Sequence, residues 1–355
     1  MKSFFVTGAA GFIGSEFVRV LLDKYPDARV VNFDALTYAG NLANLEGLVD
    51  PGEHSGRSGE DTDSLDSQSE RHTFFRGDIR DKAAVLDAMP EGVESVFNFA
   101  AESHVDRSIE SADDFVTTNV LGTQVLLDCA RYKRAGRFVQ ISTDEVMGTL
   151  PERDDAFFTE DSLLAPNSPY AASKAAAEHF VRAARETFGI DTVITRSGNN
   201  YGYRQFPEKL IPLMISNALS DEPLPLYGDG LNVRDWIFVT DHCEAVLRVY
   251  EEGRPGEAYN IGARNPLKNI DVVTGILDHL GKPHSLIRPV EDRLGHDRRY
   301  AIDPKKIETE LGWKARIGWE EGLARTIEWY AGNPEWVRRV CSRETGDGRR
   351  ETGKK

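Results

Sequence analysis

A short apolar strand that leads into a glycine-rich turn constrains the fold of this chain more than any other feature. Residues 4–6 (FFV) are followed by residues 7–14 (TGAAGFIG) and by an amphipathic run that reaches Leu22. Glycines at such a turn permit a tight bend and the close approach of a diphosphate, whose charge sits at the helix N-terminus. The spacing is Gly-x2-Gly-x2-Gly and not the commoner Gly-x-Gly-x2-Gly, so the glycines need support from the sequence that follows.

A carboxylate at the end of the next predicted strand provides this support. Residues 28–33 (ARVVNF) end at Asp34, twenty residues after Gly14. A carboxylate at this place accepts hydrogen bonds from the hydroxyls of an adenosine ribose and repels a 2′-phosphate. The order of these features, from the first strand and the glycine turn to Asp34, therefore predicts a dinucleotide-binding unit. The position of Asp34 predicts that this unit prefers NAD to NADP.

Predicted strands and helices alternate up to about residue 197. Further strands are expected at residues 72–76, 95–99, 137–142 and 191–196, with long helices at 115–132 and 170–188. This alternation predicts an α/β fold with a parallel, doubly wound (Rossmann-type) sheet. Beyond it the pattern becomes irregular, which indicates a smaller α/β lobe that binds substrate. We expect residues 1–197 and 229–256 to form the NAD-binding domain, and residues 198–228 and 257–340 to form the lobe.

Two segments lack the apolar residues that ordered structure requires. Residues 50–71 are rich in Asp, Ser, Gly and Glu, and predict a flexible loop insertion. Residues 341–355 lack an apolar anchor and predict a disordered tail.

Charge and composition exclude several classes of function. The net charge of −15 argues against nucleic acid as a partner, because phosphate backbones bind to basic surfaces. No apolar run approaches the length of a membrane span, and no signal-like segment precedes the first strand, so a cytoplasmic location is expected. The three cysteines, Cys129, Cys243 and Cys341, lie far apart without metal-ligand spacing, and no metal site is predicted.

Two adjoining segments carry four reactive side chains. Residues 137–142 read as a strand that ends just before Thr143, Asp144 and Glu145. Neighbouring side chains of a strand point to opposite faces, so the two carboxylates can reach one ligand only where the backbone has left the sheet. A strand end satisfies this condition.

The second segment is the start of a helix. Residues 167–169 (NSP) give a polar cap and a proline in the first turn, before Tyr170 and an alanine-rich run. Tyr170 and Lys174 are then neighbours one turn apart. An ammonium group at this distance favours phenolate and is expected to lower the pKa of the tyrosine from about 10.

Together these motifs resemble the extended short-chain dehydrogenase/reductase (NAD-dependent epimerase/dehydratase) family, in particular its 4,6-dehydratase branch. The resemblance covers nearly the whole chain apart from the polar loop and the tail. The segments that carry it are residues 7–14, 34–41, 100–103, 142–145, 170–174, 199–210, 234–236 and 295–300.

This resemblance implies a lyase (hydro-lyase) that converts dTDP-glucose into dTDP-4-keto-6-deoxyglucose. NAD takes the hydride from C4 and returns it to C6 after water has been eliminated across C5 and C6. By resemblance, Tyr170 accepts the C4 hydroxyl proton, assisted by Thr143 and by Lys174. Glu145 then removes the C5 proton, and Asp144 protonates the leaving C6 hydroxyl. A carboxylate suffices at C5, because the C4 ketone acidifies that proton.

The resemblance also assigns contacts to bound ligands. Cofactor contacts are expected from Gly8, Gly11, Phe12, Ile13, Gly14, Asp34, Leu36, Thr37, Asp78, Ile79, Ala100, Ala101, Ser103, Thr118, Tyr170, Lys174 and Asn200. Substrate contacts are expected from Ser103, His104, Asn199, Lys209, Leu210, Pro225, Tyr227, Arg234, Asn269, Arg293 and His296. A homodimer is implied as well, paired through the helices at residues 115–132 and 170–188, with Leu121, Val125 and Phe180 as candidate contacts.

Three residues depart from the pattern of the family. Met147 stands in place of a usual Tyr, Gly198 in place of a Ser and Leu294 in place of a Pro. Each affects the shape of the pocket and none removes a catalytic group. Another nucleotide-sugar 4-epimerase or decarboxylase of the same family, and a non-catalytic NAD-sensing protein, are the alternatives; the Asp144–Glu145 pair argues against the first and the Tyr170–Lys174 pair against the second.

Overall fold

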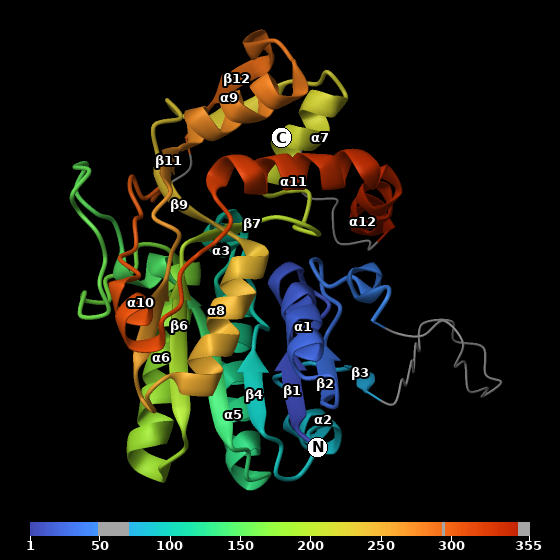
Figure 1. The fold of residues 1–355 in the computed structure, drawn as a ribbon, viewed down its shortest axis with the longest axis vertical. Helices are drawn as coiled ribbons and strands as arrows, with labels where there is room; N and C mark the ends of the chain where they lie inside the picture. Colours follow the sequence, from blue (N-terminus) through green and yellow to red (C-terminus); the bar gives the residue numbers. More distant parts are fainter. Residues whose placement is uncertain (49–70, 293–294, 347–355) are drawn as a thin grey trace, which may run out of the picture.

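The computed structural model describes residues 1–48, 71–292 and 295–346, which fold as a parallel sheet beneath a smaller lobe (Figure 1). Seven parallel strands form the main sheet in the order β10-β6-β5-β4-β1-β2-β3. They are β1 (Ser3–Thr7), β2 (Arg29–Asp34), β3 (His72–Arg76), β4 (Ser95–Asn98), β5 (Arg137–Thr143), β6 (Thr192–Ser197) and β10 (Ala258–Ile261). The predicted doubly wound α/β fold is confirmed, and the strand order reverses between β1 and β4.

Helices cover both faces of this sheet, because strands that are apolar on both sides need apolar partners on both sides. On one face, α1 (Phe12–Lys24) and α8 (Val239–Glu252) pack with α10 (Lys305–Leu311). On the other face lie α2 (Lys82–Ala88), α5 (Thr123–Tyr132) and α6 (Pro169–Phe188). The short α3 (Val105–Glu110) lies near the carboxyl edge of the sheet.

The predicted helix at residues 115–132 is less regular than its sequence suggests. It consists of α4 (Asp113–Phe115), a π-helical segment η2 (Val116–Gly122) and α5. Within the π-helical segment, the buried Asn119 binds the backbone N–H and carbonyl of Glu102 and the hydroxyl of Ser173. Widened turns of this kind often occur next to functional sites.

The smaller lobe has its own sheets and its own aromatic core. One sheet joins β7 (Asn199–Tyr201), β9 (Val233–Phe238) and β11 (Pro266–Lys268), and another joins β8 (Leu224–Tyr227) and β12 (Ile287–Val290). The helices α7 (Leu210–Leu219), α9 (Asn269–Leu280), α11 (Trp319–Gly332) and α12 (Pro334–Gly346) surround these sheets. Three single 3-10 turns complete the described elements: η1 (Leu42–Leu45), η3 (Asp144–Met147) and η4 (His284–Leu286).

The strand pairing differs from the predicted division of the chain at two places. β10, expected in the lobe, pairs with β6 in the main sheet, whereas β9, expected in the NAD-binding domain, pairs with β7 and β11 in the lobe. Each is a short strand that is far in sequence from its partner, so local pattern does not assign it to a sheet. We therefore propose a division in which β10 and α8 belong to the dinucleotide-binding domain and β9 to the lobe.

The two segments predicted to lack order have different outcomes. The predicted loop insertion at residues 50–71 lies outside the described residues apart from residue 71. The predicted tail at residues 341–355 is wrong for its first part, because α12 continues to Gly346. Buried Trp336 and Val340 anchor this helix, and helical structure propagates past the last anchored turn.

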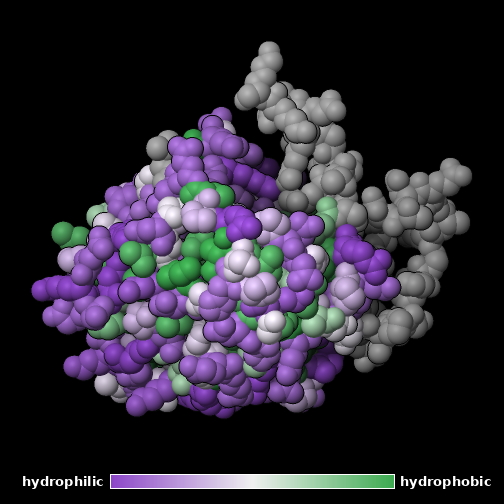
Figure 2. Space-filling model, turned by 90° about the horizontal axis from the view of Figure 1, so that it is seen from above, coloured by the Kyte–Doolittle hydropathy of each residue, from purple (hydrophilic) through white to green (hydrophobic). Residues whose placement is uncertain are grey.

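The exposed surface is mostly polar. Purple, hydrophilic side chains cover most of the face seen in Figure 2, and hydrophobic ones form smaller green areas between them. In the part of the chain that the structure describes, no helix is both long and apolar enough to cross a membrane.

Candidate active site

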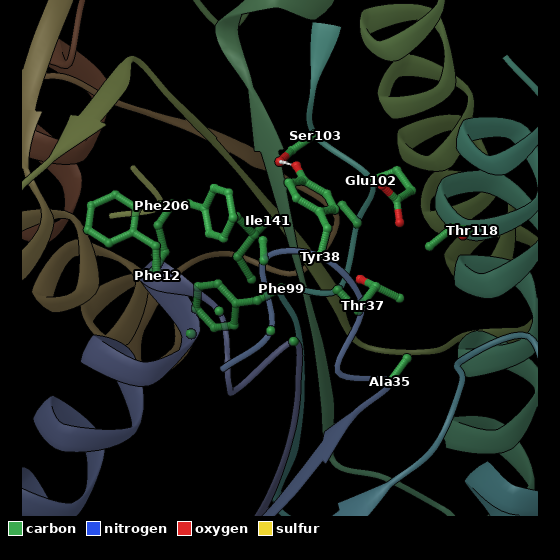
Figure 3. A pocket seen from close by; sticks show the side chains of 18 of the residues that line it. Phe12, Ala35, Thr37, Tyr38, Phe99, Glu102, Ser103, Thr118, Ile141 and Phe206 are labelled. Atoms are coloured by element: carbon green, nitrogen blue, oxygen red, sulfur yellow. Dashed lines mark hydrogen bonds between the residues drawn. The ribbon is translucent and has the colours of Figure 1, made fainter. Parts of the chain in front are cut away.

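A large cavity of about 1950 Å³ opens along the carboxyl edge of the main sheet. Its walls come from the segments that follow β1, β2, β4 and β5, and from α6 and β7 (Figure 3). Doubly wound sheets bind ligands at this edge, next to the point where the strand order reverses.

The glycine turn after β1 forms one end of the cavity. Gly8 has a φ of +66°, and a Cβ atom there would lie 2.6 Å from the backbone nitrogen of Ala100. A Cβ atom at Gly14 would lie 2.2 Å from the carbonyl oxygen of Gly8. Only glycine fits at either position, and the turn leaves the uncapped N-terminus of α1 facing the cavity, where a diphosphate is stabilised.

Asp34 ties the end of β2 to this turn. Its side chain is 8% exposed, accepts a hydrogen bond from the N–H of Ala10 at 2.9 Å and accepts another from the N–H of Leu36 at 2.7 Å. Burial raises the pKa of the carboxyl, while the two backbone donors oppose this rise. The carboxylate therefore lines the cavity in a fixed orientation, as a ribose-binding acid requires.

The structure brings together every residue predicted to contact the cofactor. All of them line the cavity: Gly8, Gly11, Phe12, Ile13, Gly14, Asp34, Leu36, Thr37, Asp78, Ile79, Ala100, Ala101, Ser103, Thr118, Tyr170, Lys174 and Asn200.

Tyr38 is a cavity residue that the sequence reasoning missed. Its ring lies 4.1 Å from the guanidinium of Arg107 and packs edge-on against Phe206, with 5.5 Å between the ring centroids. Its hydroxyl is 3.4 Å from the Ser103 hydroxyl (Figure 3). The segment after β2 thus reaches across the cavity to the lobe. Tyr38 falls within residues 34–41, one of the segments that carry the family resemblance, and this position could have identified it as a residue of the site.

The two adjacent acids lie on the 3-10 turn that follows β5. The Thr143 hydroxyl caps this turn: it accepts a hydrogen bond from the N–H of Glu145 at 3.3 Å and donates one to Asp144 Oδ1 at 3.3 Å. The backbone has therefore left the sheet at this point, as predicted. Thr143, Asp144, Glu145, Tyr170 and Lys174 all line the cavity.

Asp144 lies in an environment that favours its neutral form. The side chain is 2% exposed, and burial, followed by the charges of Glu145 and Asp235, raises its pKa well above the ordinary value. Arg234 and the Thr143 hydroxyl oppose the rise. Its Oδ2 is buried and makes no hydrogen bond within the described residues. A protonated carboxyl with an unused oxygen is suited to donate a proton.

The prediction that Lys174 lowers the pKa of Tyr170 is wrong. Burial and the charges of Glu145 and Asp144 raise the pKa of Tyr170, and a hydrogen bond with Thr143 lowers it only in part. The ammonium of Lys174 instead donates to the carbonyl oxygen of Ile141 at 2.6 Å, and burial lowers its own pKa to about 8. One-turn spacing brought the side chains to one site, but a backbone acceptor directs the lysine.

Only some of the residues predicted to bind substrate lie at the cavity. Ser103, Asn199 and Lys209 line the cavity, and the Lys209 ammonium donates to the carbonyl oxygen of Ser103 at 3.2 Å. Arg234, Tyr227 and His296 lie in the lobe instead. The guanidinium of Arg234 stacks on Tyr300 at 4.3 Å, and the ring of Tyr227 lies edge-on to His296 at 6.3 Å.

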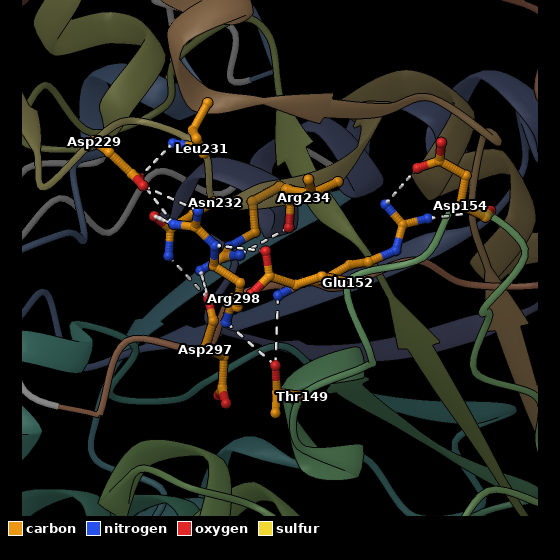
Figure 4. Close-up of polar contacts among 11 residues, drawn as sticks. Thr149, Glu152, Asp154, Asp229, Leu231, Asn232, Arg234, Asp297 and Arg298 are labelled. Atoms are coloured by element: carbon orange, nitrogen blue, oxygen red, sulfur yellow. Dashed lines mark hydrogen bonds and ion pairs between the residues drawn. The ribbon is translucent and has the colours of Figure 1, made fainter.

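Backbone and side-chain contacts around Asp297 connect the lobe to the catalytic segments (Figure 4). Its carbonyl oxygen accepts from Arg234 Nη2 at 2.8 Å and from Asn232 Nδ2 at 3.2 Å. Its carboxylate accepts from Asn167 Nδ2 at 2.7 Å, directly before the cap of α6, and from the hydroxyl of Tyr300. Arg234 in turn acts electrostatically on Asp144.

Four further predicted substrate residues lie outside the cavity wall, and of the two family departures that the structure describes, Gly198 lines the cavity and Met147 does not. His104 caps α3, where its Nδ1 accepts from the N–H of Arg107 at 3.4 Å, and it does not line the cavity. Leu210 starts α7, Pro225 lies in β8 and Asn269 starts α9, all outside the cavity wall. Met147 is buried beside Tyr300, and Gly198 lies against the backbone of Asp235. Arg293 and Leu294 lie outside the described residues.

Fold and site together define the extended short-chain dehydrogenase/reductase class, whose marks are the glycine turn, Asp34 and the Tyr170–Lys174 pair at one sheet edge. A family model described as GDP-mannose 4,6 dehydratase matches residues 5–326. A dTDP-glucose 4,6-dehydratase of Xanthomonas campestris is 48% identical over an alignment that covers 96% of each chain. The chain belongs to the dTDP-glucose 4,6-dehydratase family.

Two further comparisons agree with this membership. A dTDP-glucose 4,6-dehydratase of Shigella flexneri is 46% identical, with 95% of each chain covered. Among solved structures, DesIV (dTDP-glucose 4,6-dehydratase) of Streptomyces venezuelae, crystallised with NAD and TYD bound, is 47% identical with a TM-score of 0.87. The alignment covers 95% of this chain and 99% of that one.

Proposed function

We propose that the protein catalyses the NAD-dependent 4,6-dehydration of dTDP-glucose to dTDP-4-keto-6-deoxyglucose. The observation that carries this proposal is the Asp144–Glu145 turn, which places two carboxyl groups in the same cavity as Tyr170 and Lys174. Oxidation alone requires only the tyrosine and its partners. An acid and a base beside them supply what an elimination needs.

The residues present fit NAD as the cofactor. The glycine turn accepts a diphosphate, and Asp34 repels a 2′-phosphate. Bound NAD supplies a hydride acceptor for C4, a hydride donor for C6 and a positive ring charge in the cavity. This positive charge would offset the rise that the two carboxyl groups cause in the pKa of Tyr170, and would favour its phenolate form.

In the proposed first step, Tyr170 accepts the C4 hydroxyl proton. The Thr143 hydroxyl, turned from Asp144 to donate to Tyr170, stabilises the phenolate, and the neutral form of Asp144 removes one like charge from its surroundings. Lys174, whose ammonium donates to the Ile141 carbonyl, lines the same cavity.

In the proposed second step, Glu145 removes the C5 proton while Asp144 protonates the departing C6 hydroxyl. These roles require opposite protonation states in adjacent residues. A difference in burial supports this assignment, because Asp144 is 2% exposed whereas Glu145 is only partly buried.

The nucleotide end of the substrate is proposed to extend toward the lobe. Lys209 lies at the cavity, Arg234 is close enough to Asp144 to act on its pKa, and His296 lies against Tyr227 in the lobe. Arginine and lysine recognise diphosphate oxygens through charge-assisted hydrogen bonds. Ser103, Asn199, Leu210, Pro225, Tyr227 and Asn269 remain proposed substrate contacts on the strength of family membership.

The decisive experiment follows a hydride through the reaction. Wild-type protein incubated with dTDP-glucose carrying deuterium at C4 is expected to lose water and to carry the deuterium at C6, while solvent deuterium enters at C5. Mass spectrometry and NMR of the product measure both positions. Washout of the C4 deuterium contradicts the proposal, and an unchanged mass points instead to an epimerase or an NAD-sensing protein.

Asp235→Asn is expected to move the alkaline limb of the kcat profile to lower pH. Asp235 is 1% exposed on β9, and its pKa is raised to about 6 by burial, so it is ionised above that pH. Its charge raises the pKa of Asp144, which also faces Glu145, Arg234 and Thr143. Removing the charge lowers the pKa of Asp144, so Asp144 gives up its proton at a lower pH than in the wild-type protein. At alkaline pH, kcat should therefore fall by up to about tenfold.

A steady-state pH series on matched variants checks this shift. Asp235 Oδ1 accepts from the N–H of Asn265 at 2.8 Å, and the amide oxygen of Asn preserves that bond. Asp229→Asn, at an exposed carboxylate bound to Arg298, is the control and should leave the profile in place. If the alkaline limb stays in place in Asp235→Asn, the assignment of Asp144 as the general acid is contradicted.

We also propose that the protein is a homodimer in the cytoplasm. Leu121 is 50% exposed and Phe180 is 41% exposed, on adjacent helices of one face, whereas Val125 is partly buried. Exposed apolar side chains on paired helices favour a four-helix interface. A monomeric mass by light scattering at micromolar concentration argues against the dimer, and cell fractionation tests the location.

A further inference from the structure

The C-terminal helix α12 contacts the loop that supports the glycine turn, although it lies outside residues 5–326 matched by the family model. In Figure 1, α12 is drawn in red next to the blue segment that follows β2. The contact is specific: Trp336 Nε1 donates to Asn44 Oδ1 at 3.0 Å. Both partners are buried, with 7% of Trp336 and 2% of Asn44 exposed.

Asn44 connects Trp336 to the glycine turn at the end of the cavity. Its Nδ2 donates to the carbonyl oxygen of Ala10 at 2.8 Å, and the N–H of Asn41 donates to the same oxygen at 2.9 Å. The N–H of Ala10 in turn donates to Asp34 Oδ2. A continuous series of hydrogen bonds therefore joins the indole on α12 to the glycine turn and to the ribose-binding acid.

A second set of contacts holds the same loop from outside. Arg19 Nη2 on α1 donates to the carbonyl oxygens of Asn44 at 2.7 Å and of Glu46 at 2.8 Å. Arg339 of α12 pairs with the exposed Glu46 at 2.7 Å, which adds little stability in water. The indole is thus the buried, directional link between α12 and the loop.

We propose that Trp336 is a positioning residue for the dinucleotide, which holds Asn44 so that the glycine turn and Asp34 keep their binding geometry. Among the described residues that line the cavity, none belongs to α12. The helix therefore acts on retention of the cofactor and leaves the chemical steps unchanged. The inference rests on the proposed binding of NAD and does not depend on which sugar nucleotide the protein dehydrates.

Trp336→Phe tests this role, because it removes the indole N–H and keeps an aromatic ring in the cluster. Without the indole N–H, the buried Oδ1 of Asn44 loses its donor, and Asn44 holds the glycine turn less firmly. We therefore expect the Kd for NAD to rise about tenfold. The NAD that stays with the purified protein after gel filtration, quantified chromatographically, should fall accordingly. At saturating NAD, kcat should stay within about twofold of the wild-type value, because no reacting group is altered.

Asn44→Ala and the double variant show whether Trp336 acts through Asn44. Asn44→Ala removes the contact with Ala10 and should weaken NAD binding at least as much as Trp336→Phe. The double variant should match Asn44→Ala alone, since residues in one series of bonds are not additive. Trp329→Phe is the control: Trp329 packs edge-on against Trp336 at 4.9 Å in the same cluster and should retain NAD like the wild type.

Unchanged NAD affinity in folded Trp336→Phe overturns the proposal. So does a loss of equal size in Trp329→Phe with a lowered Tm, which would assign the effect to aromatic packing. Additive losses in the double variant would also refute a route through Asn44. NAD binding is measured without dTDP-glucose, so a protein that binds NAD but dehydrates nothing would refute the proposed function and leave this test intact.

Discussion

Glu145→Gln is expected to stop water loss while oxidation at C4 still proceeds. The amide cannot remove the C5 proton, and loss of a general base lowers the rate by about 10²–10⁴-fold. Tyr170, Thr143 and Lys174 are unchanged, so the oxidation machinery remains in the cavity. Rapid mixing with dTDP-glucose should therefore produce near-ultraviolet absorbance from reduced cofactor that persists, whereas in wild-type protein it appears only transiently.

Two matched variants sharpen the interpretation of this result. Asp144→Asn should slow water loss as well, though less completely, because its amide still donates a hydrogen bond to the leaving oxygen. Glu152→Gln, at a carboxylate that is 69% exposed and paired with Arg298, should behave like the wild type. Solvent deuterium that enters C5 at the normal rate in Glu145→Gln would assign the base to another residue.

Tyr170→Phe should abolish the reaction at its first step and give no reduced cofactor at all. Phenylalanine keeps the aromatic ring but accepts no proton, so the C4 hydroxyl stays protonated and turnover falls by about 10²–10⁴-fold or more. The variant should retain NAD, because the glycine turn and Asp34 are untouched. Stopped-flow absorbance and chromatographic cofactor analysis separate these two outcomes.

The control for Tyr170→Phe is a second tyrosine in the same cavity. Tyr38→Phe keeps the ring contacts with Arg107 and Phe206 and loses only the 3.4 Å contact with Ser103. It should retain turnover within about threefold, as expected for one weak neutral hydrogen bond. Reduced cofactor that forms normally in Tyr170→Phe would contradict the assignment of Tyr170 as the oxidation base.

Local sequence patterns predicted the main sheet, and they placed the proposed catalytic residues at its carboxyl edge, for a physical reason. Each strand ends at the same edge, so residues that follow β1, β2, β4 and β5 converge wherever the sheet forms. Glycine at positions 8 and 14 is required by backbone contacts inside a single motif. The predicted cofactor contacts and catalytic side chains therefore all line one cavity.

Features that depend on distant segments were not accessible in this way. The pairing of β10 with β6 and the bond between Trp336 and Asn44 join residues far apart in the chain. The electrostatics of Tyr170 failed for a related reason. Spacing along α6 placed Lys174 near it, but the carbonyl of Ile141, on another element, determines where the ammonium points.

The separation of chemistry from the lobe has an evolutionary consequence. Thr143 ends β5 of the main sheet and Asp144 and Glu145 lie on the turn that follows it, whereas Tyr227, Arg234 and His296 belong to the lobe. Asp297 connects the two parts through its hydrogen bonds. If Tyr227 and His296 contact the nucleotide as proposed, we expect substitutions around them in the lobe to alter selectivity for the nucleotide while the groups that follow β5 keep their positions. Under this proposal, one inherited reaction can be carried to new nucleotide donors by substitutions in the lobe.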